Sequence, residues 1–211
     1  MNKQLYIKSY VQFSQQTARF NGVELNIEKN ESLSGFAKNI YNYLNLSYPK
    51  FYKMDNMSKF GLLAAEFLFK DESHHPNVSL IFANKSSSLD TDIIYHKSIE
   101  SSTAFFPSPS IFVYTLPNIV LGEICIKHKI QGENMFFILD NFDANTYIET
   151  VSLQYRLNKA DTFILSWIEV FKDKLNVFSC YLTDKEEKNC LILNLDNLNT
   201  LFKTHANGTN N

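Results

Sequence analysis

Apolar residues follow two spacings along the chain, and segments with the two spacings alternate. Four segments have apolar side chains at every third or fourth position, which predicts helices. These segments are 36–46, 54–69, 117–130 and 144–157. Short continuous apolar runs are typical of strands buried on both faces, and they occur at 78–83, 135–139 and 162–170. Further strands are predicted at 5–13, 175–182 and 189–195.

The alternation of helices and buried strands favours an α/β fold, with helices packed on a mixed, mostly parallel sheet. The length of 211 residues suits a single domain, which we expect to span 1–203. The polar residues 204–211 are expected to form a frayed tail. The segment 86–110 is rich in Ser, Thr and Pro and has no clear period, which predicts a long connection of the kind that often carries function.

Charge and composition argue against several kinds of partner. Lys plus Arg number 20 and Asp plus Glu number 22, so there is no basic excess to attract nucleic acid. No apolar stretch reaches the roughly 18 residues of a membrane span, and the first residues lack the apolar core of a signal peptide. We therefore expect a cytoplasmic protein without a membrane span, in which the cysteines are reduced thiols.

The residue types that bind metals and cofactors show no typical arrangement. The three cysteines, which lack zinc-ligand spacing, are Cys125, Cys180 and Cys190. The pair His74-His75 lies in a predicted loop without acidic or thiol neighbours, which favours a solvated pair over a metal site. Asp90 and Asp92 would suit a cation only with a third ligand, and the sequence nearby offers none. Glycine-rich phosphate loops are also missing, so we expect no metal and no cofactor.

Two segments in the first two thirds of the chain resemble the β-ketoacyl-acyl-carrier-protein synthase family. The segment 53–66 begins with Lys53-Met54-Asp55 and continues as an alanine-rich helix, similar to the family's helix with an Arg-Met-Asp-type opening. The segment 106–124 contains Pro117-Asn118 and is similar to the family's Pro-Asn helix. In the family this helix leads into a Lys-Gly-Pro-type turn.

A third segment continues the resemblance from that turn. The turn is 130–134 in this chain, with Glu133 where the family usually has Pro. The residues up to Glu169 then look like the strand, the nucleophile elbow, its helix and the next strand of the family. Each match is weak by itself, but their order and spacing extend the resemblance over roughly 5–169. It implies one half of a thiolase-like fold, because synthases of this family are about twice as long.

The family resemblance also implies where a nucleophile would be. In these synthases a cysteine lies at the strand-to-helix turn, where the helix N-terminus lowers the pKa of its thiol and backbone N–H groups form an oxyanion hole. Counting from Gly132, that position falls on Asn141, or with one residue of slippage on Asp140 or Phe142. None of these is a thiol, so the covalent step is missing. From the residues alone, the segment 140–143 is equally an ordinary Asx turn or helix cap.

A synthase-like chain without its nucleophile resembles the chain-length-factor subunits, which are not catalytic and pair with an active synthase. The resemblance implies a heterodimer with a full-length β-ketoacyl synthase, acyl carrier protein as a further partner, and a homodimer as another assembly. The strand 135–139 would pair with its counterpart across the dimer. Our candidates for the interface or acyl tunnel are Phe112, Phe136, Phe137 and Leu139.

Two alternatives belong to other functional classes. The chain could be an enzyme that retains acyl-transfer or malonyl-decarboxylating activity with a different nucleophile. It could also be a stand-alone protein-interaction domain outside fatty-acid, polyketide or polyene biosynthesis. Turnover of malonyl-carrier substrate by the purified chain would favour the first alternative, and genomic neighbours unrelated to acyl carriers would favour the second.

Overall fold

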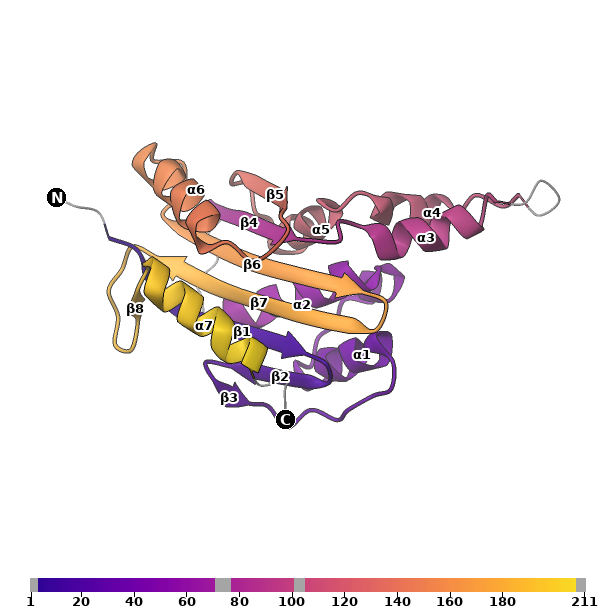
Figure 1. The fold of residues 1–211 in the computed structure, drawn as a ribbon, viewed down its shortest axis with the longest axis horizontal. Coiled ribbons are helices and arrows are strands. Elements are labelled where there is room, and N and C mark those ends of the chain that lie inside the picture. The colour runs from indigo at the N-terminus through magenta and orange to yellow at the C-terminus, as the bar shows by residue number, and fades with distance from the viewer. Residues whose placement is uncertain (1–3, 71–76, 101–104, 208–211) are drawn as a thin grey trace.

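The computed structural model describes residues 4–70, 77–100 and 105–207, without the side chains of 205–207. Within these residues, helices cover both faces of one mixed sheet (Figure 1). The strands are β1 (Tyr6–Ser14), β2 (Thr17–Phe20), β3 (Val23–Glu24), β4 (Val78–Asn84), β5 (Asn134–Ile138), β6 (Thr162–Phe171), β7 (Lys174–Thr183) and β8 (Leu191–Ile192). The predicted α/β class with a mixed sheet is confirmed, but the sheet is not mostly parallel. Only the pairings of β4 with β5 and β6 are parallel, and the other five pairings among the described strands are antiparallel.

The sheet has the order β3-β2-β1-β7-β6-β4-β5, and β8 pairs with the start of β1. Strand β4 pairs in parallel with both β5 and β6, which is the arrangement that helical crossovers produce. Strands β6 and β7 form a long antiparallel hairpin, and β1 is antiparallel to β7. Strands β1, β4, β5 and β6 therefore all run in the same direction, and β5 is the last strand at its end of the sheet.

Helices of the two layers belong to different parts of the chain. The helices are α1 (Leu33–Tyr43), α2 (Asn56–Phe69), α3 (Leu89–Lys97), α4 (Pro109–Phe112), α5 (Ile119–His128), α6 (Ala144–Arg156) and α7 (Leu195–Asn207), with 3-10 turns η1 (Pro49–Lys53) and η2 (Val113–Thr115). Helices α1, α2 and α5 cover one face, and α6 and α7 cover the other. Helices α3 and α4 form an arm beyond the end of the sheet (Figure 1).

The pleat of the strands divides the core into two clusters. On β4, Leu80 and Phe82 point into the cluster under α1, α2 and α5, whereas Ile81 and Ala83 point into the cluster under α6 and α7. Strand β6 divides its side chains in the same way. This alternation explains the continuously apolar runs at 78–83 and 162–170, because both faces of the strands are covered.

Three local predictions were wrong, and one predicted boundary is shifted. The segment 86–110 was expected to be a long connection, but it contains α3 and the start of α4. The strand predicted at 189–195 is only the two residues of β8, and α7 begins at Leu195. The strand at 135–139 was expected to be buried on both faces, but its residues are half-buried or exposed because β5 is an edge strand. Helix α7 reaches Asn207, past the start of the expected tail at 204.

Candidate functional site

The connection between β5 and α6 is the place where the sequence predicts a lost nucleophile. It consists of residues 139–143, and α6 begins at Ala144. Asn141 is exposed and lies between the strand and the helix, so the strand-turn-helix arrangement of an elbow is present. Its interpretation as the remnant of an active-site position stays a prediction.

Asp143, two residues after Asn141, is the N-cap of α6. Its carboxylate accepts hydrogen bonds from the backbone N–H groups of Asn145 at 3.0 Å and Thr146 at 3.3 Å, and from the Thr146 hydroxyl at 2.7 Å. The hydrogen bond from the Thr146 side chain is the main reason why the pKa of Asp143 is lowered. The first backbone donors of α6 therefore face a carboxylate rather than an open oxyanion site.

Phe142 fixes the connection from the other side. Its ring stacks on Phe202 of α7 at 3.9 Å between centroids, with an angle of 7° between the planes. It also lies 5.4 Å from the ring of Tyr147 and 6.0 Å from that of Phe178. Helix α7 thus covers the residue next to Asn141. Sequence reasoning missed this contact because α7 itself was not predicted.

None of the three thiols lies in the β5–α6 connection. Cys125 is half-buried on α5, Cys180 is fully buried on β7, and Cys190 lies between β7 and β8. Burial raises the pKa of the Cys125 and Cys180 thiols, which disfavours the nucleophilic thiolate. The local chemistry therefore offers no cysteine for acyl transfer at the turn.

The histidines and aspartates considered as metal ligands are also accounted for. His74 and His75 lie outside the described residues, and His96 is exposed on α3. Asp90 and Asp92 lie in the first turn of α3, where Asp90 accepts a hydrogen bond from the Lys172 N–H at 3.1 Å. No group of three or more metal-ligating side chains occurs among residues 4–70, 77–100 and 105–207.

In the described part of the chain, no single helix has the length and apolar character needed to cross a membrane. The segments Pro109–Thr115 and Ile119–His128 are long and apolar enough only when taken together, and a bend of 102° separates them.

The outer side of β5 is the second feature of this region. Leu80 donates its N–H to the Glu133 carbonyl at 3.3 Å, and Leu139 donates to the Asn84 carbonyl at 2.9 Å. Because backbone groups alternate along a strand, those of Phe136 and Ile138 point away from β4. Among the described strands, none pairs with this side of β5. Ile138 is 52% exposed, so an apolar side chain accompanies the open backbone edge.

The four predicted interface residues fall in two places. Phe136, Phe137 and Leu139 are half-buried on or next to β5, with Phe136 packed against one core cluster and the other two against the second. Phe112 is exposed on α4, 5.3 Å from the ring of Tyr95, and α4 lies away from β5 in Figure 1. The structure therefore groups three of them, and their role at an interface stays a prediction.

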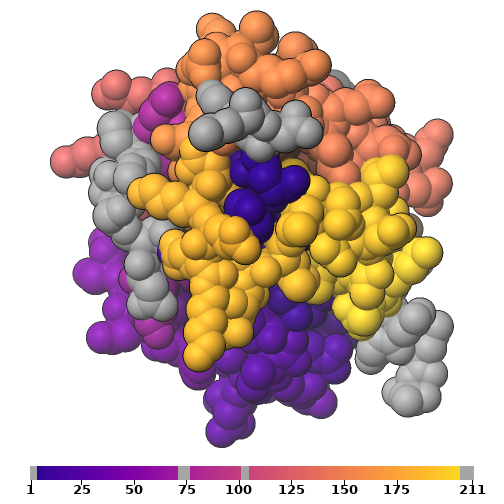
Figure 2. Space-filling view, turned by 90° about the vertical axis from the view of Figure 1, so that its left-hand side faces the viewer, coloured from indigo at the N-terminus to yellow at the C-terminus, as the bar shows by residue number. Residues whose placement is uncertain are grey.

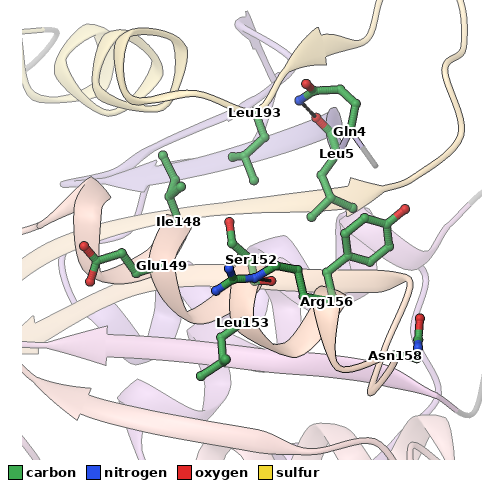
Figure 3. A pocket seen from close by; sticks show the side chains of 10 residues that line it. Gln4, Leu5, Ile148, Glu149, Ser152, Leu153, Arg156, Asn158 and Leu193 are labelled. Atoms are coloured by element: carbon green, nitrogen blue, oxygen red, sulfur yellow. Dashed lines mark hydrogen bonds between the residues drawn. The ribbon is translucent and has the colours of Figure 1, made fainter. Parts of the chain in front are cut away.

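A groove lies beside α6 on the same face as α7. It has a volume of about 1070 Å³, and its lining includes Leu5 before β1, Leu193 after β8, and Ile148 and Ser152 of α6. Figure 2 looks toward this end of the molecule, where the indigo start of the chain is visible between orange α6 and yellow α7. Figure 3 shows the lining side chains at close range.

Comparison with known proteins gives a match in structure only. Neither a protein-family model nor a curated protein sequence matches the chain. The ishigamide ketosynthase/chain length factor matches with a TM-score of 0.64 at 11% identity, covering 85% of this chain and 62% of that chain. This chain therefore spans less than two thirds of that structure's length.

Two further solved structures are similar. The ketosynthase ApeO in complex with its chain length factor ApeC, from Xenorhabdus doucetiae, matches with a TM-score of 0.56 at 9% identity, covering 85% of this chain and 79% of that chain. The AntDE:AntF complex of a type II polyketide synthase acyl-carrier protein with its ketosynthase matches with a TM-score of 0.57 at 11% identity, covering 87% and 63%. The chain has the thiolase-like fold of these ketosynthase and chain-length-factor structures.

Proposed function

We propose that this chain is a non-catalytic, chain-length-factor-like subunit that pairs with an active 3-oxoacyl-acyl-carrier-protein synthase. The pair would act in the cytoplasm, in fatty-acid, polyketide or polyene-type biosynthesis. The observation that carries the proposal is the β5–α6 connection, which has the strand-turn-helix form but an amide at Asn141. The fold shared with ketosynthase and chain-length-factor structures supports the same reading.

The chemistry of the connection supports a subunit rather than an independent condensing enzyme. An amide cannot form the acyl-enzyme thioester, which requires a thiol. The three thiols of the chain lie elsewhere, on α5, on β7 and between β7 and β8. Burial further keeps two of the three thiols protonated. A synthase partner would therefore supply the nucleophile, and this chain would supply a dimer surface.

The open side of β5 is the surface that fits such a partner. An unpaired edge strand pairs readily with another chain unless charges, proline or a covering element prevent it. The β5 residues Met135, Phe136, Phe137 and Ile138 include no charge and no proline, and none of the described strands pairs with their outer side. Pairing with the edge strand of a ketosynthase would extend the sheet across the heterodimer and cover Ile138.

Co-purification with a ketosynthase encoded near this chain's gene tests the proposal. Ile138→Pro removes an outward-facing N–H without removing a hydrogen bond to β4, so we expect it to abolish the complex. Ile138→Ala keeps that N–H and loses only the side chain, and we expect it to retain most of the complex. Size-exclusion chromatography of the co-expressed chains measures both. A wild-type chain that stays separate from the ketosynthase contradicts the proposal.

An activity assay separates the proposed role from residual enzymatic activity. Radiolabelled malonyl-acyl-carrier-protein would be supplied to the chain alone, to the ketosynthase alone, and to both together. We expect condensation only when the ketosynthase is present, with product length set by the pair. Condensation or decarboxylation by the purified chain alone would show that it has catalytic activity and contradict the subunit role.

A further inference from the structure

The outward surface of α6 carries a stripe of residues that includes exposed leucines, which is unusual for a helix face in contact with solvent. Its six members are Ile148, Glu149, Ser152, Leu153, Arg156 and Leu157, the last being the C-cap residue of α6. Ile148 and Ser152 are half-buried at the margin of the stripe, and Ile148 also packs against the core. Leu153 is 51% exposed and Leu157 is 59% exposed, although the opposite side of the helix buries Tyr147 and Val151 in the core. Helices of soluble proteins usually place polar residues on the face away from the core, so these leucines indicate a contact surface.

The order of residues within this α6 stripe is symmetric about its midpoint, between Ser152 and Leu153. Positions at equal distances from that midpoint are complementary in chemistry. Ile148 and Leu157 are both apolar, while Glu149 and Arg156 carry opposite charges. The central positions combine a small side chain, Ser152, with a large one, Leu153.

We infer that the α6 stripe binds a second copy of this chain, with the two α6 helices antiparallel across a two-fold axis at Ser152 and Leu153. A two-fold interface brings each residue opposite its symmetry-related counterpart, so a contact made by one copy is repeated by the other. Glu149 of each copy then faces Arg156 of the other, and Ile148 faces Leu157. The pattern is complementary to itself only in this antiparallel arrangement.

The groove beside α6 gives the second helix a place to lie. Figure 3 shows Ile148, Glu149, Ser152 and Arg156 projecting from α6, with Leu5 and Leu193 across the groove. The small side chain of Ser152 permits close approach of the two helix axes at the crossing point. Leu153 of one copy would fill the space above Ser152 of the other. A large side chain at both positions would keep the two helices apart.

This self-association does not depend on the proposed function. It uses the α6 stripe, whereas the proposed ketosynthase contact uses the outer side of β5. Glu149 and Arg156 are two turns apart on one helix. They are therefore too far apart to form the usual intrahelical ion pair, which joins residues three or four positions apart. A partner surface with charges of one sign would be complementary to either Glu149 or Arg156, but not to both. A second copy is complementary to both residues.

Charge reversal tests the arrangement in the purified full-length chain. Glu149→Arg alone places two like-charged pairs in the interface, and Arg156→Glu alone does the same, so each should weaken the dimer by roughly tenfold or more in Kd. The double variant E149R/R156E restores opposite charges in both pairs and should restore the dimer. Sedimentation equilibrium at protein concentrations from about 1 to about 100 µM measures the dissociation constants of the wild type and of the three variants.

Controls separate this dimer from other effects. Glu28→Arg and Lys38→Glu make the same charge changes at exposed positions away from α6 and should leave the dimer unchanged. Ile138→Pro should also leave it unchanged, because β5 is not involved. Thermal unfolding checks that each variant folds. A wild-type chain that is monomeric throughout the concentration range, or a double variant as weak as the single ones, overturns the inference.

Discussion

The two faces of the sheet differ in how completely helices cover them. On the face under α1, α2 and α5, eleven of the fourteen residues of α2 are buried, and Phe36 and Phe60 have no exposed surface. On the other face, α6 buries five of its thirteen residues, and a groove remains beside it. We call these the closed face and the open face.

The described residues cover the closed face without a contribution from another chain. Helix α2 lies between α1, α5 and the sheet, which explains why its apolar residues point in nearly every direction. The buried carboxylate of Glu123 on this face is paired: it contacts Lys50 at 2.7 Å and accepts a hydrogen bond from Tyr114 at 3.0 Å. The open face instead keeps leucines on the outside of α6, which suits a surface that a partner completes.

The largest expected difference between the faces comes from truncating one apolar residue on each. Phe60→Ala on α2 empties a fully buried site and should lower the free energy of unfolding by about 3–5 kcal/mol. Leu153→Ala on α6 removes a half-exposed side chain and should change it by no more than about 0.5 kcal/mol at monomeric concentrations. Urea unfolding measures both. Similar losses for the two variants would mean that the open face is packed as tightly as the closed one.

Two helical glycines sharpen the description of the closed face. A Cβ atom at Gly61 of α2 would collide with Val120 and lie 3.0 Å from Ile168, whereas a Cβ at Gly122 of α5 would meet nothing within 4 Å. Gly61→Ala should therefore destabilise the fold by about 1–3 kcal/mol through overpacking. Gly122→Ala should stabilise it by about 0.5–1 kcal/mol, because alanine favours the helix.

The opposite signs of these two changes make the glycine comparison decisive. Both substitutions add one methyl group to a helix, so their difference isolates the close approach of α2 to α5 and β6. Denaturation midpoints of the two variants against the wild type measure it. A neutral or stabilising Gly61→Ala would show that α2 and α5 have room to separate, and the closed face would then be less tightly packed than described.

The elements of the closed face could be predicted from sequence because their patterns are local. The apolar spacing of 54–69 indicated α2, and in the structure Asp55 caps this helix by accepting the Ser58 N–H at 2.9 Å. The continuous runs of β4 and β6 indicated strands covered on both sides. In each case the residues that decide the structure are close neighbours in the chain.

The edge strand and the last helix could not be predicted in the same way. The apolar run at 135–139 arises because Phe136 packs against one core cluster and Phe137 against the other, but such a run carries no information about which neighbouring strands pair with it. Helix α7 is rich in Asn and Thr, which are poor helix formers, and its stability comes from packing Leu198 and Phe202 on the sheet.

The candidate site was predicted in outline only. Counting from Gly132 placed Asn141 between a strand and a helix, where the structure has it. The alternative of a helix cap within 140–143 did not specify the residue, and the structure identifies it as Asp143. The contact of Phe202 with Phe142 was not predicted, because it joins residues sixty positions apart. The symmetric stripe of α6 became recognisable only once its outward face was defined by burial.

The smallest expected effect concerns two buried acids on the closed face, whose pH dependences oppose each other. Burial acts to raise the pKa of Glu66, but hydrogen bonds from His128 at 2.6 Å and from Lys127 hold it below its usual value. For Asp55, burial prevails and raises the pKa despite hydrogen bonds from Ser58 and Thr91. In the wild type the two contributions partly cancel.

Removing one acid at a time should reveal each contribution with its own sign. Ionised Glu66 stabilises the fold above its unfolded-state pKa, and this stability is lost as pH falls through its lower folded-state pKa. Glu66→Gln should therefore flatten the acid loss of stability. The pKa of Asp55 is higher in the folded state than in the unfolded state, so protonation of Asp55 stabilises the fold as pH falls. Asp55→Asn, which keeps a capping oxygen, removes this stabilisation and should steepen the acid loss of stability. Urea unfolding from about pH 7 to about pH 3 measures both slopes. Two variants that change the slope in the same direction would show that Asp55 is held ionised like Glu66, and that the closed face stabilises both carboxylates.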